Sequence, residues 1–78
     1  MLEKNIFLKD FEAVKRFIEV VNSKPYDIEL SLGDTTVNAK SINDVFSLDL
    51  TKPMKLTAHC ENSGELLLQI KNYIYKGK

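Results

Sequence analysis

The stretch NAKSINDVFSLDL, residues 38–50, joins the end of a predicted strand to a short predicted helix. Ser41 is a typical helix N-cap, and Asp44 three residues later fits a capping box, in which each side chain bonds an unpaired backbone N–H. Ile42, Val45 and Phe46 follow at spacings of three and four residues, so the helix has an apolar side. The stretch therefore predicts a capped helix of one or two turns over residues 41–47.

Alternating apolar residues predict strands on both sides of this helix. Before it, residues 26–32 alternate, Gly33-Asp34 forms a turn, and residues 35–39 return as the second arm of a hairpin. After it, residues 54–60 form another strand, and residues 2–8 form the first strand of the chain. Phe7 breaks the alternation there and is expected at an edge of the sheet or in a contact surface. The other inward-pointing side chains are expected to be Leu2, Ile6, Leu8, Tyr26, Ile28, Leu30, Leu32, Val37, Ala39, Met54, Leu56, Ala58 and Cys60.

Two longer segments have the period of a helix. Asp10 is a good N-cap for a helix that ends near Asn22, ahead of Pro25. Its buried stripe is expected to be Phe11, Val14, Phe17, Ile18 and Val21. Asn62 or Ser63 is expected to cap a last helix with the stripe Leu67, Ile70 and Ile74, widened by Leu66 and Tyr73.

The element order is β-α-β-β-α-β-α, which predicts an α+β fold in a single domain over residues 1–78. Because every strand alternates, each has one solvated face. We therefore expect a four-stranded antiparallel sheet with its three helices on one side.

Composition and charge narrow the class of protein. The chain has 11 basic and 11 acidic residues, and this balance argues against a nucleic-acid binder. No segment is typical of a signal peptide or a membrane span, and the single cysteine allows no intramolecular disulfide, so we expect a cytoplasmic protein. His59 is the only histidine and falls on the polar face of a strand, where a lone imidazole predicts no metal site. We expect no metal and no cofactor.

Residues 40–42 (KSI) and 45–48 (VFSL) resemble the Lys-Ser-Ile-Met-Gly-Val-Met-Ser-Leu stretch of HPr, the histidine-containing phosphocarrier family of the bacterial sugar phosphotransferase system. The similarity extends from about Leu2 to Tyr75 and is most specific around Ser41. It implies an HPr-like open-faced β-sandwich in which the predicted 41–47 helix is the short middle one. It also implies that Ser41 is the target of a regulatory protein kinase. The catabolite-repression variant of HPr, which lacks the histidine but has the serine, is similar in this respect.

The resemblance also places the phosphohistidine of the family at Asp10, at the start of the first helix. The arginine and proline positions that follow hold Glu12 and Ala13. A carboxylate ~5 Å from a phosphoryl group opposes it by about 2–3 kcal/mol at an effective dielectric constant of about 20–40. We therefore expect no phosphohistidine transfer, and we interpret Asp10 as an N-cap rather than as a site of aspartyl phosphate.

Two interpretations of Ser41 remain open: a helix cap only, or a cap that also accepts phosphate. The helix dipole favours phosphate at an N-cap by about 0.3–1 kcal/mol per charge, whereas Asp44 at ~6 Å opposes it by roughly 1–3 kcal/mol. A partner-binding patch is expected at Ile42 and Phe46, with Leu48 nearby and Lys40 beside it. In the HPr family, this region meets enzyme I, the sugar permease domains, a transcriptional regulator and the HPr kinase.

These observations predict a regulatory or adaptor protein that acts by protein–protein contact, without carrier activity and with Ser41 as a phosphorylation site. The alternative is a non-signalling interaction module that has drifted from HPr. A dimer is one form that this alternative allows. An enzyme is not expected, because an acyl-phosphate hydrolase would need arginine and asparagine at an anion loop. The only arginine, Arg16, falls in the middle of the first helix on its solvent side.

Overall fold

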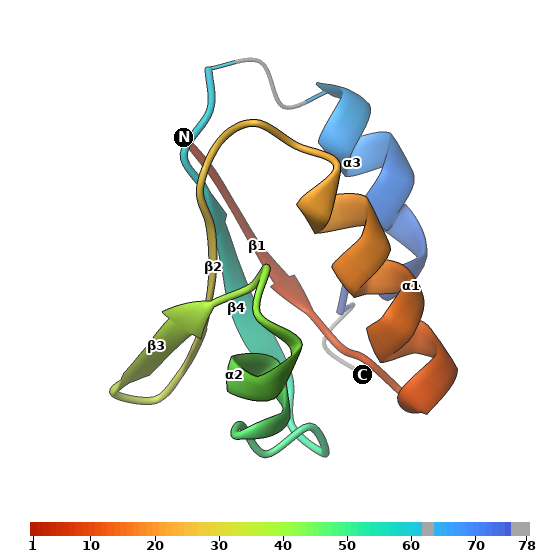
Figure 1. Ribbon diagram of the computed structural model, residues 1–78, viewed down its shortest axis with the longest axis vertical. Helices are drawn as coiled ribbons and strands as arrows, with labels where there is room; N and C mark the ends of the chain where they lie inside the picture. Colours follow the sequence, from red (N-terminus) through yellow and green to blue (C-terminus); the bar gives the residue numbers. More distant parts are fainter. Residues whose placement is uncertain (62–63, 76–78) are drawn as a thin grey trace.

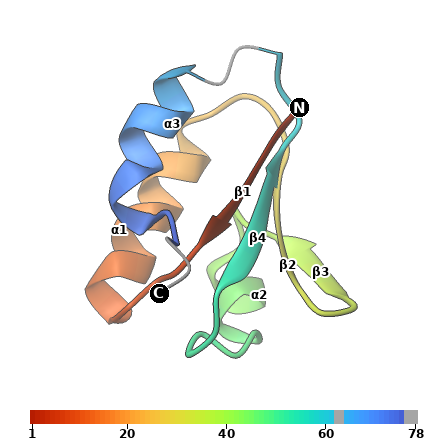
Figure 2. The same cartoon turned by 180° about the vertical axis from the view of Figure 1, so that it is seen from behind.

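The computed structural model describes residues 1–61 and 64–75 and contains the predicted α+β fold. Strands β1 (Leu2–Ile6), β2 (Ile28–Leu32), β3 (Thr35–Asn38) and β4 (Met54–Ala58) form one sheet in the order β1-β4-β2-β3. All neighbouring strands are antiparallel. The helices are α1 (Phe11–Asn22), α2 (Ile42–Phe46) and α3 (Gly64–Ile70), and a 3₁₀ turn (Lys71–Tyr73) follows α3. Figure 1 and Figure 2 show α1 and α3 side by side over the same face of the sheet.

The β2–β3 hairpin turns at Gly33-Asp34, as predicted. Leu32 pairs with Thr35, so the loop has two residues, and Gly33 has a φ of 61°. A positive φ at the first central position is the geometry of a type II′ turn, in which glycine carries no steric penalty. Beyond this turn, β2 pairs with β4 through Leu30 and Leu56, so the hairpin is anchored in the middle of the sheet.

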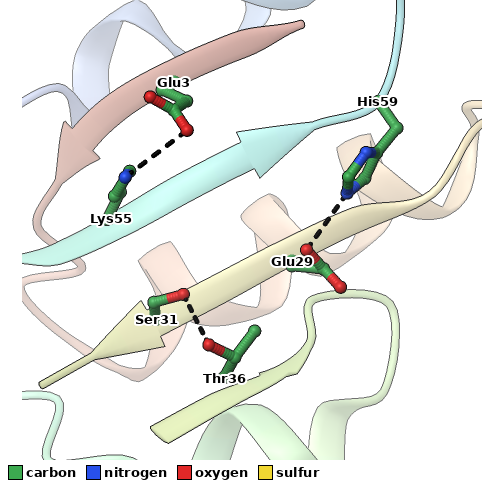
Figure 3. A network of polar contacts seen from close by, with 6 residues as sticks. All are labelled: Glu3, Glu29, Ser31, Thr36, Lys55 and His59. Atoms are coloured by element: carbon green, nitrogen blue, oxygen red, sulfur yellow. Dashed lines mark hydrogen bonds and ion pairs between the residues drawn. The ribbon is translucent and has the colours of Figure 1, made fainter. Parts of the chain in front are cut away.

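The opposite face of the sheet is polar and open. Figure 3 looks onto it, with the helices behind the strands, and shows three cross-strand contacts. Lys55 Nζ lies 3.4 Å from Glu3 Oε2, His59 Nε2 lies 3.1 Å from Glu29 Oε1, and the hydroxyls of Ser31 and Thr36 are 2.9 Å apart. His59 is therefore an exposed member of this face, as its position in the sequence predicts.

The core lies between the sheet and the helices. Phe17, Val14 and Val21 of α1 are buried as predicted, and Val45 is the buried residue of α2. The other buried apolar side chains are Leu2, Ile6, Leu8, Ala13, Ile28, Leu30, Ala39, Leu48, Met54, Leu56, Ala58, Leu66 and Ile70. Lys24 is the one charged side chain that is buried within the described residues, and its Nζ lies 2.6 Å from Glu65 Oε1 of α3.

Phe11 contradicts the expected burial, whereas other expected core residues pack against the core but are only half-buried: Ile18, Tyr26, Leu32, Val37, Cys60, Leu67 and Tyr73. Phe11 is 59 % exposed, because it occupies the first helical position of α1, beyond the part that packs on the sheet. Cys60 is half-buried, because the chain leaves β4 after Ala58 and the Cys60 N–H turns back to the Ala58 carbonyl. In α3, Leu66 and Ile70 make the buried stripe and Leu67 is only half-buried. The predicted cap at Asn62 or Ser63 lies outside the described residues.

The last helix is predicted to include Tyr73 and Ile74, but residues 73–75 lie outside α3. The helix ends at Ile70, and after the 3₁₀ turn the chain runs along the outer edge of β1. Phe7 N–H donates to the Tyr73 carbonyl at 2.7 Å, Tyr75 N–H donates to the Asn5 carbonyl at 2.8 Å, and Ile74 pairs with Ile6. We call residues 73–75 the edge segment.

Candidate functional site

The N-terminus of α1 is the first part of the candidate site. Asp10 has an extended backbone and its Oδ1 accepts the Ala13 N–H at 2.8 Å, which confirms it as the N-cap. Its side chain and that of Glu12 are exposed, so two carboxylates surround the helix end. The helix dipole stabilises both of them. They also oppose an additional anion there, because like charges repel at this short range.

The N-terminus of α2 is the second part. Ser41 has an extended backbone, and its Oγ accepts the Asp44 N–H at 3.4 Å, so the cap is present but its hydrogen bond is long. The reciprocal half of the predicted capping box is absent. The Ser41 N–H donates to the Asn38 carbonyl at 3.1 Å instead, because the chain turns tightly out of β3.

Two of the predicted partner-binding residues make contacts within the fold. Leu48 is only 7 % exposed and belongs to the core, because it lies directly after α2 where the chain turns under the helix. Lys40 is half-buried, and its ammonium donates to the Lys24 carbonyl at 2.7 Å. The Lys40 carbonyl in turn accepts the Asn22 side-chain amide at 3.1 Å. Lys40 therefore ties the entry of α2 to the end of α1.

The other two predicted residues are exposed, and they join a residue that the sequence interpretation placed in the core. Ile42 is 39 % and Phe46 40 % exposed. The Phe46 ring stacks on the ring of Phe11, with centroids 5.5 Å apart and an interplanar angle of 17°. Lys15 Nζ lies 5.6 Å from the centroid of the Phe11 ring. We call Phe11, Ile42 and Phe46 the α1–α2 aromatic surface.

Asp10 borders two hollows. The smaller, about 350 Å³, lies beside the aromatic surface and is lined by Phe7, Lys9, Asp10, Phe11, Val14, Phe46, Leu50 and Thr51. The larger, about 980 Å³, lies between the start of α1 and the edge segment. Arg16 and Glu12 both line this larger hollow, so it carries charges of both signs. The first turn of α1 thus projects between two open depressions.

The groups with shifted pKa values lie outside the first turns of α1 and α2. The Lys24 ammonium lowers the pKa of Glu65, and hydrogen bonds from Thr51 lower the pKa of Asp49. Burial, with a smaller effect of Cys60, raises the pKa of Tyr26. Residues 1–61 and 64–75 contain no group of three metal-ligating side chains. None of their helices has the length and apolar character that a bilayer span needs.

Comparison with known proteins identifies the fold by its similarity to solved structures. No protein-family model matches the chain, and no curated protein does. Solved structures are similar to it, among them two HPr proteins. HPr-C-His from Thermoanaerobacter tengcongensis has a TM-score of 0.78 and 23% identity, over 95% of this chain and 91% of that one. A phosphocarrier protein HPr from Bacillus anthracis has a TM-score of 0.71 and 22% identity, over 95% of this chain and 96% of that one. The chain therefore has the fold of the HPr phosphocarriers.

Proposed function

We propose that this chain is an HPr-like regulatory or adaptor protein that acts by protein–protein contact and carries no phosphohistidine. One observation carries the proposal: the exposed aromatic pair Phe11 and Phe46 lies beside a helix N-terminus occupied by Asp10 and Glu12. Stacked rings in water favour a protein partner. The carboxylates disfavour an incoming phosphoryl group.

The hydrogen bonding at Asp10 supports the proposed lack of carrier activity. Its carboxylate already accepts the Ala13 N–H, which is the kind of donor that would otherwise bind a phosphoryl oxygen. Glu12 adds a second negative charge in the same turn. We expect no phosphoryl transfer from phosphoenolpyruvate and enzyme I. The double variant Asp10→His with Glu12→Arg should gain some transfer if Asp10 occupies the position of the phosphohistidine.

Ser41 is the proposed regulatory site. Its cap bond is long at 3.4 Å and its side chain is half-exposed, so a kinase can reach the hydroxyl at a small cost in helix stability. A phosphate at this N-cap gains from the dipole but faces Asp44 one turn away. Modification is therefore expected to loosen α2 and change the aromatic surface that includes Ile42 and Phe46.

The direct test is incubation with an HPr kinase and ATP, followed by intact-mass measurement. We expect the mass gain of one phosphoryl group in the starting protein and none in Ser41→Ala. Ser47→Ala is the matched control, because Ser47 lies at the other end of α2, where its hydroxyl donates to the Asp44 carbonyl. A gain that survives Ser41→Ala would remove the kinase part of the proposal.

A second function, a non-signalling interaction module, is favoured by the aromatic surface alone. Under this alternative, pull-down of a partner would be unchanged by Ser41→Asp and lost with Phe46→Ser.

For both functions, the partners to test first are phosphotransferase-system proteins, a transcriptional regulator and the HPr kinase. We expect the protein to act beside them in the cytoplasm.

A further inference from the structure

The α1–α2 aromatic surface leaves a large apolar area in water. Phe11 is 59 %, Phe46 40 % and Ile42 39 % exposed. Full burial of an aromatic side chain removes roughly 150–250 Å² from water. Because Phe11 is 59 % and Phe46 40 % exposed, the two rings together can still lose about as much area as one such side chain, which favours contact. The adjacent hollow of about 350 Å³ adds the apolar side chains of Phe7, Val14 and Leu50 to its lining.

Charges of opposite sign lie on either side of Phe11 along α1. Asp10 precedes the ring in the sequence and borders the hollow, while the Lys15 ammonium lies over the ring one turn later. Neither side chain forms an ion pair with residues 1–61 or 64–75, where the four ion pairs involve other groups. An ammonium and a carboxylate are thus left beside the exposed rings.

We propose that this surface pairs with the same surface of a second copy of the chain. A twofold contact joins the same surface of both copies, so if Lys15 of one copy meets Asp10 of the other, the reverse contact forms as well. A surface that carries both positive and negative charges suits such a contact. With two α1 helices antiparallel across the Phe11 rings, Lys15 of each copy lies against Asp10 of the other. The helix dipoles then also oppose one another favourably. The formal net charge of the chain is zero, so the copies carry no net repulsion.

The association between the two copies is expected to be weak, because the contact area is small. A contact at the low end of specific interfaces buries about 600 Å² per copy, roughly an eighth of the 5018 Å² surface. The patch consists of one turn of α1 and the five-residue α2, so we expect a contact at this low end. The protein is therefore monomeric when dilute and paired when concentrated.

Self-pairing would regulate the proposed function, because the rings that would meet a partner are covered in the pair. This regulatory role rests on the proposed function. A partner would compete with the second copy, and modification of Ser41 would shift that competition through α2. The pairing itself needs no partner and no kinase, so it is measured on the purified chain alone.

The test is sedimentation equilibrium of the purified chain from about 10 μM to about 1 mM, the range in which contacts of this size dissociate. We expect the apparent mass to rise from one chain towards two. Phe11→Ser and Phe46→Ser should each weaken association at least tenfold. Leu68→Ser is the matched control, because Leu68 is 70 % exposed on α3 and its change should leave association as it is.

A charge reversal tests the geometry. Lys15→Glu should weaken association at least threefold, because it places a carboxylate against Asp10 of the second copy. Arg16→Glu makes the same charge change on the neighbouring residue, which lines the other hollow, and should have little effect. Circular dichroism checks that each variant is folded. A chain that stays monomeric at about 1 mM, or a dimer that Leu68→Ser weakens as much as Phe11→Ser does, would overturn the proposal and leave the surface to a different protein.

Discussion

Helices α1 and α2 begin in the same way but are held differently. Asp10 and Ser41 are both extended residues that accept the backbone N–H three positions later, at 2.8 Å and 3.4 Å respectively. Behind its cap, α1 has four buried residues over 12 positions, whereas α2 has Val45 alone over five. A helix as short as α2 has little stability of its own, so it depends on that one buried side chain and on its surroundings.

This difference separates a fixed region from an adjustable one. The start of α1 holds a charged cap with a short hydrogen bond, which keeps the Asp10 carboxylate in place. The start of α2 holds a neutral hydroxyl with a long bond, where a new charge has a large relative effect. Four predictions test the contrast.

The largest effect is expected for Phe17→Ala in α1. Phe17 is fully buried and its ring meets Tyr73 edge-to-face, with centroids 6.1 Å apart. Loss of the ring should lower the free energy of unfolding by about 3–5 kcal/mol. Chemical denaturation measures this, and exposed Phe11→Ala serves as the control. Similar losses for the two variants would contradict the assignment of the core.

Val45→Ala should cost about 2 kcal/mol, from two methyl groups and the cavity that they leave. The loss should be concentrated in α2, because Val45 is its one buried residue. Hydrogen exchange should show faster exchange of the amides in residues 42–48 than of those in α1. Uniform acceleration over both helices would show that α2 is not an independent element.

Removal of the two caps compares the helices directly. Asp10→Ala should lower the free energy of unfolding by about 1–2 kcal/mol, and Ser41→Ala by about 0.5 kcal/mol, because the Ser41 bond is long and partly replaceable by water. Asp10→Asn, which can still cap, is the control and should cost less than Asp10→Ala. A larger loss for Ser41→Ala than for Asp10→Ala would reverse the comparison.

The smallest effect is a pH dependence at the far end of α1. Lys24 lowers the pKa of Glu65 in the folded protein, so this pair stabilises the fold above the ordinary glutamate pKa of 4.5. That contribution is lost as the pH falls below 4.5 and through the lowered pKa. The unfolding midpoint of Glu65→Gln should therefore fall less between pH 6 and about pH 3 than that of the starting protein. Parallel curves would show that the contact has no linkage to folding.

Strand patterns and caps were predictable from the sequence because they depend on neighbours a few residues apart. Alternation located the four strands, and the caps at Asp10 and Ser41 were recognised from residue type and spacing. Strand ends were displaced by two residues at Ile6, Ile28 and Ala58, because pairing with a neighbouring strand, rather than alternation, decides where a strand stops.

The candidate site was less predictable because it depends on contacts between distant parts of the chain. Phe11 fits the period of the buried stripe, and only the position of α2 shows that its ring stacks on Phe46. Lys40 is predicted beside the patch, and only the folded chain shows that its ammonium bonds the Lys24 carbonyl. Leu48 follows α2 in the sequence but turns into the core.

The edge segment also affects how the protein avoids aggregation. By pairing with β1, residues 73–75 occupy backbone groups that would otherwise accept a strand from another molecule. The opposite edge is β3, which has only four residues, three of them exposed and polar: Thr35, Thr36 and Asn38. Short polar edges are poor templates for amyloid-like stacking. A chain cut before Tyr73 should therefore precipitate more readily during refolding than the intact one.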